Sequence, residues 1–385
     1  MSITGSSSTG SRRSTGAAPP RDPAYAGEHP KAAGSDFAVL NRRITEAGLL
    51  ERRPAHYAVR MSVVGSMFVA VWLAFFLIGP SWWQLVVAAL MGLVFSQVGL
   101  LAHDVAHRQV FRTRRTSELV GRTAGNVAIG MSYGWWAEKH TRHHNNPNHD
   151  DLDPDVQPEV LIWATESALG RRGLKAFVGR HQAGLFFPLL TLLSIDLRIS
   201  SIKALVRPGM KQRGLEAGLL AVHLVTYVAA LVVVLSPLQA LAFLVVHQAV
   251  FGVYLGMTFA PNHKGMPHPT GDEDYLRKQV LTSRNVTGGW LVDTLLGGLN
   301  HQIEHHLFPA MPAPNLRKAR PIVKAYCAQV GVPYVETSLV ESYRQALRHL
   351  HEVGSPLRAA AAERKASPPD DGVRTGSGRE VRSGR

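Results

Sequence analysis

Long uncharged apolar runs dominate the hydrophobic pattern of this chain. Pro80 and Ser81 alone separate the first two runs, and Ser236 and Pro237 alone separate the last two. Each run approaches or exceeds the roughly 20 residues with which a helix crosses the hydrocarbon core of a bilayer. Buried helices of a large soluble protein are the alternative, but uncharged runs of this length are uncommon there. We therefore predict four membrane-spanning helices in two hairpins, at about 61–79, 82–102, 217–235 and 238–260.

Positive charges flank the outer ends of both predicted hairpins, whereas neither short turn carries a charge. Lys and Arg collect on the cytoplasmic side of membrane proteins. We therefore expect both turns to face away from the cytoplasm and both termini to lie in it, which makes this a multi-pass protein of the cell membrane. The flanking residues are Arg42, Arg43, Arg52, Arg53 and Arg60 before the first run, Arg108, Arg112, Arg114 and Arg115 after the second, Lys211 and Arg213 before the third, and Lys264, Arg277 and Lys278 after the fourth.

The polar segments around these runs complete an all-α integral membrane fold. Residues 1–36 and 355–385 are rich in Ser, Gly, Pro and charged residues, so we expect a disordered N-terminal arm and a disordered basic tail. The membrane domain is then 37–354, with a cytoplasmic helical cap formed by 103–214 and 261–354. The formal net charge is +14, and the charge asymmetry across the membrane accounts for most of it. We therefore predict no nucleic-acid partner.

Histidine is the residue type that the composition singles out, with 18 His against the single cysteine Cys327. One cysteine excludes an internal disulfide and a Cys-ligated iron–sulfur cluster within the chain. The histidines cluster at helical spacings of three and four residues, and the topology places the clusters on the cytoplasmic side. The clusters are His103 and His107 after the second run, His140, His143 and His144, and Gln302, His305 and His306, while His263 follows the fourth run.

This number of imidazoles exceeds what one metal accepts and fits two redox metals better. Imidazole suits iron, copper and zinc alike, so the ligand type alone leaves the metal open. A non-enzymatic membrane heme or metal-binding protein is an alternative of another class, and His223 and His247, which lie inside the predicted spans, could in principle pair on a heme. That reading leaves the clustered cytoplasmic histidines unexplained.

The three clusters resemble the histidine boxes HxxxH, HxxHH and [HQ]xxHH of the integral-membrane fatty acid desaturases, and the resemblance extends over about residues 55–334. The segment from His301 to Pro309 (HQIEHHLFP) is similar to the third box of the front-end and bacterial linoleoyl-CoA-type members. The stretches 145–148 (NNPN) and 153–155 (DPD) are similar to that family as well.

The resemblance implies two non-haem iron ions that use O2 and two electrons to introduce a cis double bond into a long-chain acyl group, carried either by CoA or by a membrane lipid. A hydroxylase or ketolase of the same superfamily is the alternative, and the QIEHH-type third box favours desaturation. The metal ligands that the resemblance implies are His103, His107, His140, His143, His144, His263, His305 and His306.

Five further residues stand beside these ligands in the motifs. Gln302 occupies the variable position of the third box, which fits a contact made through water or from outside the ligand set. Asp104 and Glu304 are candidates for orienting ligand rings through their second N–H, and Asn262 precedes His263. The resemblance gives no role to His301.

Front-end members often carry a fused cytochrome b5-like domain with an HPGG motif, and the nearest match here is EHPK at 28–31. We therefore expect electrons from a separate donor, either a ferredoxin or a reductase. The chain length of the substrate, the double-bond position, the acyl carrier and the oligomeric state cannot be read from the sequence.

Overall fold

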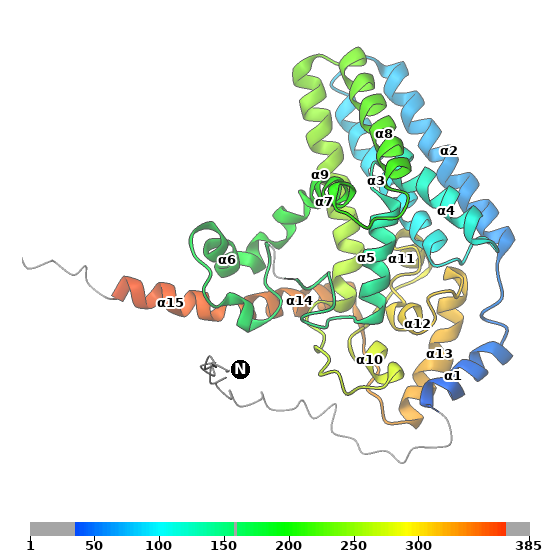
Figure 1. The fold of residues 1–385 in the computed structure, drawn as a ribbon, viewed down its shortest axis with the longest axis vertical. Helices are drawn as coiled ribbons and strands as arrows, with labels where there is room; N and C mark the ends of the chain where they lie inside the picture. Colours follow the sequence, from blue (N-terminus) through cyan, green and yellow to red (C-terminus); the bar gives the residue numbers. More distant parts are fainter. Residues whose placement is uncertain (1–34, 158–159, 367–385) are drawn as a thin grey trace, which may run out of the picture.

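The computed structural model describes residues 35–157 and 160–366. Most of the expected N-terminal arm, residues 1–34, therefore lies outside the described residues, as do residues 367–385 of the expected tail. The described chain is almost entirely helical, with four long helices at one end and shorter helices at the other (Figure 1). Its only strands within these ranges are β1 (Asn285–Thr287) and β2 (Glu336–Ser338), which pair in parallel.

Four helices are long and apolar enough to cross a membrane, which confirms the predicted integral-membrane fold. They form two antiparallel hairpins, and each helix differs from its predicted span at one or both ends. The helix α9 runs on past the apolar run to His263, and α2 begins earlier because Pro54 is favourable in the first helical turn. The bounds are α2 (Pro54–Ile78), α3 (Gln84–Ala106), α8 (Arg213–Val234) and α9 (Pro237–His263).

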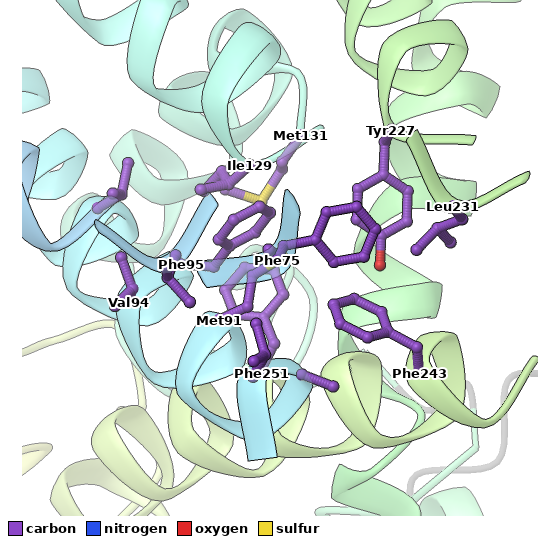
Figure 2. Close-up of a cluster of buried hydrophobic side chains, with 14 of the residues drawn as sticks. Phe75, Met91, Val94, Phe95, Ile129, Met131, Tyr227, Leu231, Phe243 and Phe251 are labelled. Atoms are coloured by element: carbon purple, nitrogen blue, oxygen red, sulfur yellow. The ribbon is translucent and has the colours of Figure 1, made fainter. Parts of the chain in front are cut away.

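The helices α3 and α9 form the centre of the bundle, and both end next to the cap. Gly92 of α3 permits their close approach, because a Cβ at this position would lie 2.9 Å from the Val250 side chain. Figure 2 shows the buried cluster around them, in which Phe75, Phe95 and Phe243 interleave with side chains of α8 and with Ile129 and Met131. Apolar side chains on the outer faces of the four helices stay exposed, as a bilayer requires.

Two histidines inside these helices form hydrogen bonds to neighbouring segments. His247 Nδ1 of α9 lies 2.6 Å from the Tyr227 hydroxyl of α8, and His223 Nδ1 donates to the Val127 carbonyl at 2.9 Å. The two rings therefore use these nitrogens to join helices, as polar side chains in membranes commonly do.

A bent helix pair lies beside the four-helix bundle. Its helices α6 (Gly173–Leu190) and α7 (Leu193–Val206) meet at 85°, which fits a broken span or a re-entrant loop. The cap consists of α1 (Asp36–Glu46), α4 (Arg114–Arg122), the π-helical segment η2 (Thr123–Ala128), α5 (Tyr133–Asn145), the 3₁₀ turn η3 (Thr165–Ala168), α10 (Tyr275–Leu281), α11 (Trp290–Leu295), α12 (Gln302–Leu307), α13 (Ala313–Gln329) and α14 (Leu339–Val353).

The expectation of disorder from residue 355 onward needs correction. Residues Ser355–Ala366 form the helix α15, which continues outward from α14 (Figure 1). This segment contains a run of four alanines, and alanine has the highest intrinsic helix propensity of all residues. The run therefore favours a helix although the segment is polar overall. Leu357 anchors the helix because it is buried in a small cluster with Ile162 and Val353.

Candidate metal centre

Imidazoles from three separate segments converge at the cap end of α3. One set, here called the first histidine group, has its ligand-capable ring nitrogens within 4.8 Å of one another. The helix α3 supplies one ring from its last turn and one from the residue that caps it, α5 supplies two, and α12 supplies one. The members of the first histidine group are His103, His107, His140, His144 and His305.

A second histidine group lies directly beside the first. His143, His263 and His306 are all buried, and their ligand-capable nitrogens also lie within 4.8 Å of one another. The Gln302 amide nitrogen is 2.9 Å from His263 Nε2, so the variable residue of the third motif reaches this group. The rings of His144 and His306 stack with centroids 4.2 Å apart, which places the two groups in contact.

The helix α5 divides its histidines between the two groups. It begins at Tyr133 after the cap residue Ser132, whose side chain accepts from the Trp135 N–H. Consecutive residues on a helix point about 100° apart. His144 therefore faces the first group together with His140, while its neighbour His143 faces His263 and His306, at ring distances of 4.8 and 5.1 Å.

Hydrogen bonds from outside hold the rings of the second histidine group. His143 Nδ1 donates to Asp153 Oδ2 at 2.9 Å, and His306 Nδ1 donates to Gln279 Oε1 at 2.9 Å. His263 Nδ1 donates to the Thr282 carbonyl at 3.0 Å. Such partners fix the tautomer and the orientation of a ring, so that its other nitrogen faces inward.

Rings of the first histidine group mostly contact each other. His107 Nε2 and His144 Nε2 lie 2.9 and 3.1 Å from His140 Nε2. Trp136 stacks on His140 with ring centroids 4.7 Å apart. His103 Nδ1 is 3.4 Å from Asp104 Oδ1, and the other oxygen of this carboxylate accepts from Arg60 at 2.6 Å.

Several buried nitrogens of these rings have no hydrogen-bond partner within the described residues. They are His103 Nε2, His144 Nδ1, His306 Nε2 and both nitrogens of His305. A buried polar atom without a partner costs about 1–3 kcal/mol. A metal ion bound to one nitrogen of each of these rings would satisfy that atom, so the donor set fits a metal pair.

Burial sets the charge of these side chains. Loss of solvent, reinforced by the neighbouring imidazoles, holds the pKa of His107, His140, His144, His305 and His306 well below the usual value. The rings are therefore neutral near pH 7. A neutral imidazole is the form that binds a metal, so binding requires no prior loss of a proton.

Three of the other predicted site residues have different surroundings. His301 precedes the first residue of α12, and its Nε2 lies 3.2 Å from Asp293 Oδ1. The carboxylate of Glu304 accepts hydrogen bonds from Tyr334 and Asn285 rather than from a ligand ring. The Asn262 amide donates to the Leu299 carbonyl at 3.0 Å and lies 3.3 Å from Gln302 Oε1.

The side chains that orient the second histidine group are not among the site residues predicted from the sequence. Asp153 lies in the DPD stretch noted above, ten residues after His143, and its position in a motif was the one available signal. Gln279 and Thr282 lie in and after α10, far from any histidine in the sequence. Trp136 was detectable in principle, because it lies four residues before His140 and hence on the same helix face.

Comparisons with known proteins show which proteins this chain is similar to. The family model described as fatty acid desaturase matches residues 80–338. An acyl-lipid (9-3)-desaturase of Physcomitrium patens is 35% identical over 73% of this chain and 54% of its own length. Fatty acid desaturase 3 of Bos taurus is 29% identical over 87% of this chain and 76% of its own length. The delta(6)-fatty-acid desaturase fat-3 of Caenorhabditis elegans is 25% identical over 85% and 76% of the two chains. This chain thus spans about half the length of the moss protein and about three quarters of the two animal proteins.

Proposed function

Because this chain belongs to the fatty acid desaturase family of oxidoreductases, we propose that it introduces a cis double bond into a long-chain acyl group, using O2 and a pair of non-haem irons. The observation that carries the proposal is the sorting of the motif histidines into two adjacent groups of five and three imidazoles. Structural zinc sites use four protein ligands, so one such metal would leave half of the eight rings without a role.

The proposed iron ligands are the members of the two histidine groups, with Gln302 next to His263 in the second. When bound, the irons and O2 supply the oxidant that an unactivated methylene C–H bond requires. The overall reaction removes two hydrogens from adjacent methylenes, consumes one O2, two electrons and two protons, and releases two waters. The ligand set itself consists of neutral rings, which leave the metals with high positive charge.

The side chains around the two groups have two tasks in this proposal. Asp153, Gln279 and the Thr282 carbonyl hold rings of the second group in the binding orientation. The aromatic rings of Trp136 and Phe259, with centroids 5.8 and 6.1 Å from that of His103, keep water away from the first group.

We propose that the two histidine groups and both termini face the cytoplasm of a cell membrane. The groups lie at the end of the four-helix bundle where α2 and α8 begin and where α3 and α9 end. Arg52, Arg53, Arg60 and Arg213 lie at this end, whereas the short turns at 79–83 and 235–236 contain no charged residue. This distribution supports the orientation.

A separate ferredoxin or reductase is proposed to supply the electrons. The sequence has no cysteine set for an iron–sulfur cluster and no nucleotide-binding glycine fingerprint. Since one relative is named a delta(6) desaturase and another an acyl-lipid (9-3)-desaturase, a double bond near the carboxyl end is the first product to look for.

The test is the fatty-acid profile of a host that expresses the chain, measured by mass spectrometry with localisation of double bonds. Purified protein from iron-replete cells is analysed for metal in parallel. We expect a new unsaturated acyl product and two irons per chain. His306→Ala should abolish the product and lower the iron content, and the matched control His351→Ala, an exposed ring on α14, should change neither. A hydroxylated product, or full activity with one zinc after iron chelation, would refute the proposal.

A further inference from the structure

The short helix α12 contributes to both histidine groups although it is only six residues long. It carries His305 into the first group, and His306 and Gln302 into the second. Isolated helices of this length are unstable in water, because the cost of forming the first turn exceeds what the few hydrogen bonds return. Contacts from the surrounding segments must therefore fix the position of α12.

Glu304 provides a fully buried contact of this kind. Its side chain is fully enclosed, with Oε1 accepting from the Tyr334 hydroxyl at 2.6 Å and Oε2 accepting from the Asn285 amide at 2.8 Å. The Asn285 amide also lies 2.7 Å from the Tyr334 oxygen, and Asn285 Oδ1 accepts from the Ile303 backbone N–H at 3.0 Å. We call Glu304, Asn285 and Tyr334 the α12 clamp.

The clamp joins α12 to a rigid frame. Asn285 is the first residue of β1, and its backbone N–H donates to the Val335 carbonyl at 3.0 Å, just after Tyr334. The strand β2 pairs in parallel with β1, and its residue Glu336 forms ion pairs with Arg320 and Lys324 of α13. Asn285 and Tyr334 thus reach Glu304 from adjacent positions on a frame that is tied to a longer helix.

We propose that the α12 clamp positions α12 so that its three donors reach both histidine groups at once, and that Glu304, Asn285 and Tyr334 are positioning residues for metal binding. A carboxylate suits this role because it offers separate oxygens to two donors. The inference rests on the proposed function, since it assumes that both groups bind iron.

The clamp has an unequal effect on the two groups. The helix α12 supplies one of the five imidazoles of the first group, but one of the three imidazoles of the second, together with Gln302. A displaced α12 therefore removes a larger share of the donors from the second group. Loosening the clamp should release iron from the second group first and leave the first group occupied.

The experiment measures iron per folded chain in purified Tyr334→Phe and Glu304→Gln proteins after size-exclusion chromatography. Tyr334→Phe removes a single hydroxyl, and Glu304→Gln keeps the size of the side chain but only one acceptor oxygen. We expect iron to fall from two to about one per folded chain in both, and excess Fe(II) to restore the second iron. The matched control is Tyr343→Phe, which removes the buried hydroxyl that donates to the Met257 carbonyl at 2.6 Å on α9; it should retain two irons.

Each other outcome has a defined meaning. Two irons per folded chain in both variants, or an equal loss of iron in Tyr343→Phe, would overturn the positioning role. If Glu304→Gln does not fold, the smaller change in Tyr334→Phe decides the question, and a loss of folded protein with an unchanged iron ratio would also overturn the proposal. A wild-type chain that binds no iron would instead refute the proposed function, so the two failures are distinguishable.

Discussion

The Asp153 carboxylate is the partner of His143 and offers a direct test of how the second histidine group is held. It is fully buried, and its Oδ2 accepts hydrogen bonds from His143 Nδ1 at 2.9 Å and from the Asn148 N–H at 2.8 Å. Its Oδ1 accepts from the Asp155 N–H at 2.8 Å. The substitution Asp153→Asn keeps the shape but replaces one oxygen with an NH2 group, so at least one of these donors loses its acceptor.

Two effects follow from Asp153→Asn. One buried donor without an acceptor lowers the free energy of unfolding by about 1–3 kcal/mol. Replacing the charged partner of a metal-binding imidazole typically costs about 10–100-fold in metal affinity, which corresponds to about 1.4–2.8 kcal/mol. Because His143 belongs to the second group, the weaker affinity should be confined to one of the two irons.

The assay is a competition titration of the iron-loaded protein with a chelator under anaerobic conditions. Wild type should release two irons, and Asp153→Asn should release one at the wild-type chelator concentration and the other at a concentration about 10–100-fold lower. Asp150→Asn is the matched control, because Asp150 also pairs with an imidazole, that of His268 at 2.7 Å, but at the surface. Equal release curves for wild type, Asp150→Asn and folded Asp153→Asn would refute the role assigned to Asp153.

Three further predictions concern the third motif, the topology and the electron supply. His305→Ala and His306→Ala should abolish desaturation and lower the bound iron, whereas His301→Ala should keep measurable activity because this ring faces Asp293. The test measures iron content, folded yield and product together. A fully active His305→Ala protein would contradict the prediction. Reporter fusions at Ser81 and Ser236 should report the outside and a C-terminal fusion the cytoplasm, so a C-terminal reporter active outside would overturn the proposed orientation. Purified protein with O2 and acyl substrate should turn over only after a carrier and its reductase are added, and turnover with NADPH alone would contradict a separate donor.

Hydropathy predicted the membrane helices well because uncharged apolar runs of this length are uncommon outside membranes. The ends of the helices were less predictable, since hydropathy stops at the first polar residues while the backbone continues. The helix α9 reaches His263 because the cap covers its polar end, where Asn262 and His263 are both buried. The helix α15 was missed because composition alone does not separate an alanine-rich helix from a disordered tail.

Spacing predicted which residues could share a helix face, but it did not predict how they would be divided. His143 and His144 are neighbours in one motif, and the structure places them in different groups. That division depends on where α9 and α12 approach α5, which no local pattern encodes. Gln279 was invisible for the same reason, because it meets His306 only through the packing of α10 on α12.

The two histidine groups differ in what holds their rings, and this difference links the separate tests. Each ring of the second group donates to an acceptor outside it, in Asp153, Gln279 or the Thr282 carbonyl. The first group has more imidazoles, and within the described residues both nitrogens of His305 lack a hydrogen-bond partner. Under the proposed function, the first group would bind iron through the number of its donors, whereas the second group would depend on the orientation of its few donors. Changes to Asp153 and to the α12 clamp act on orientation, so both should weaken the same iron although they lie on different segments.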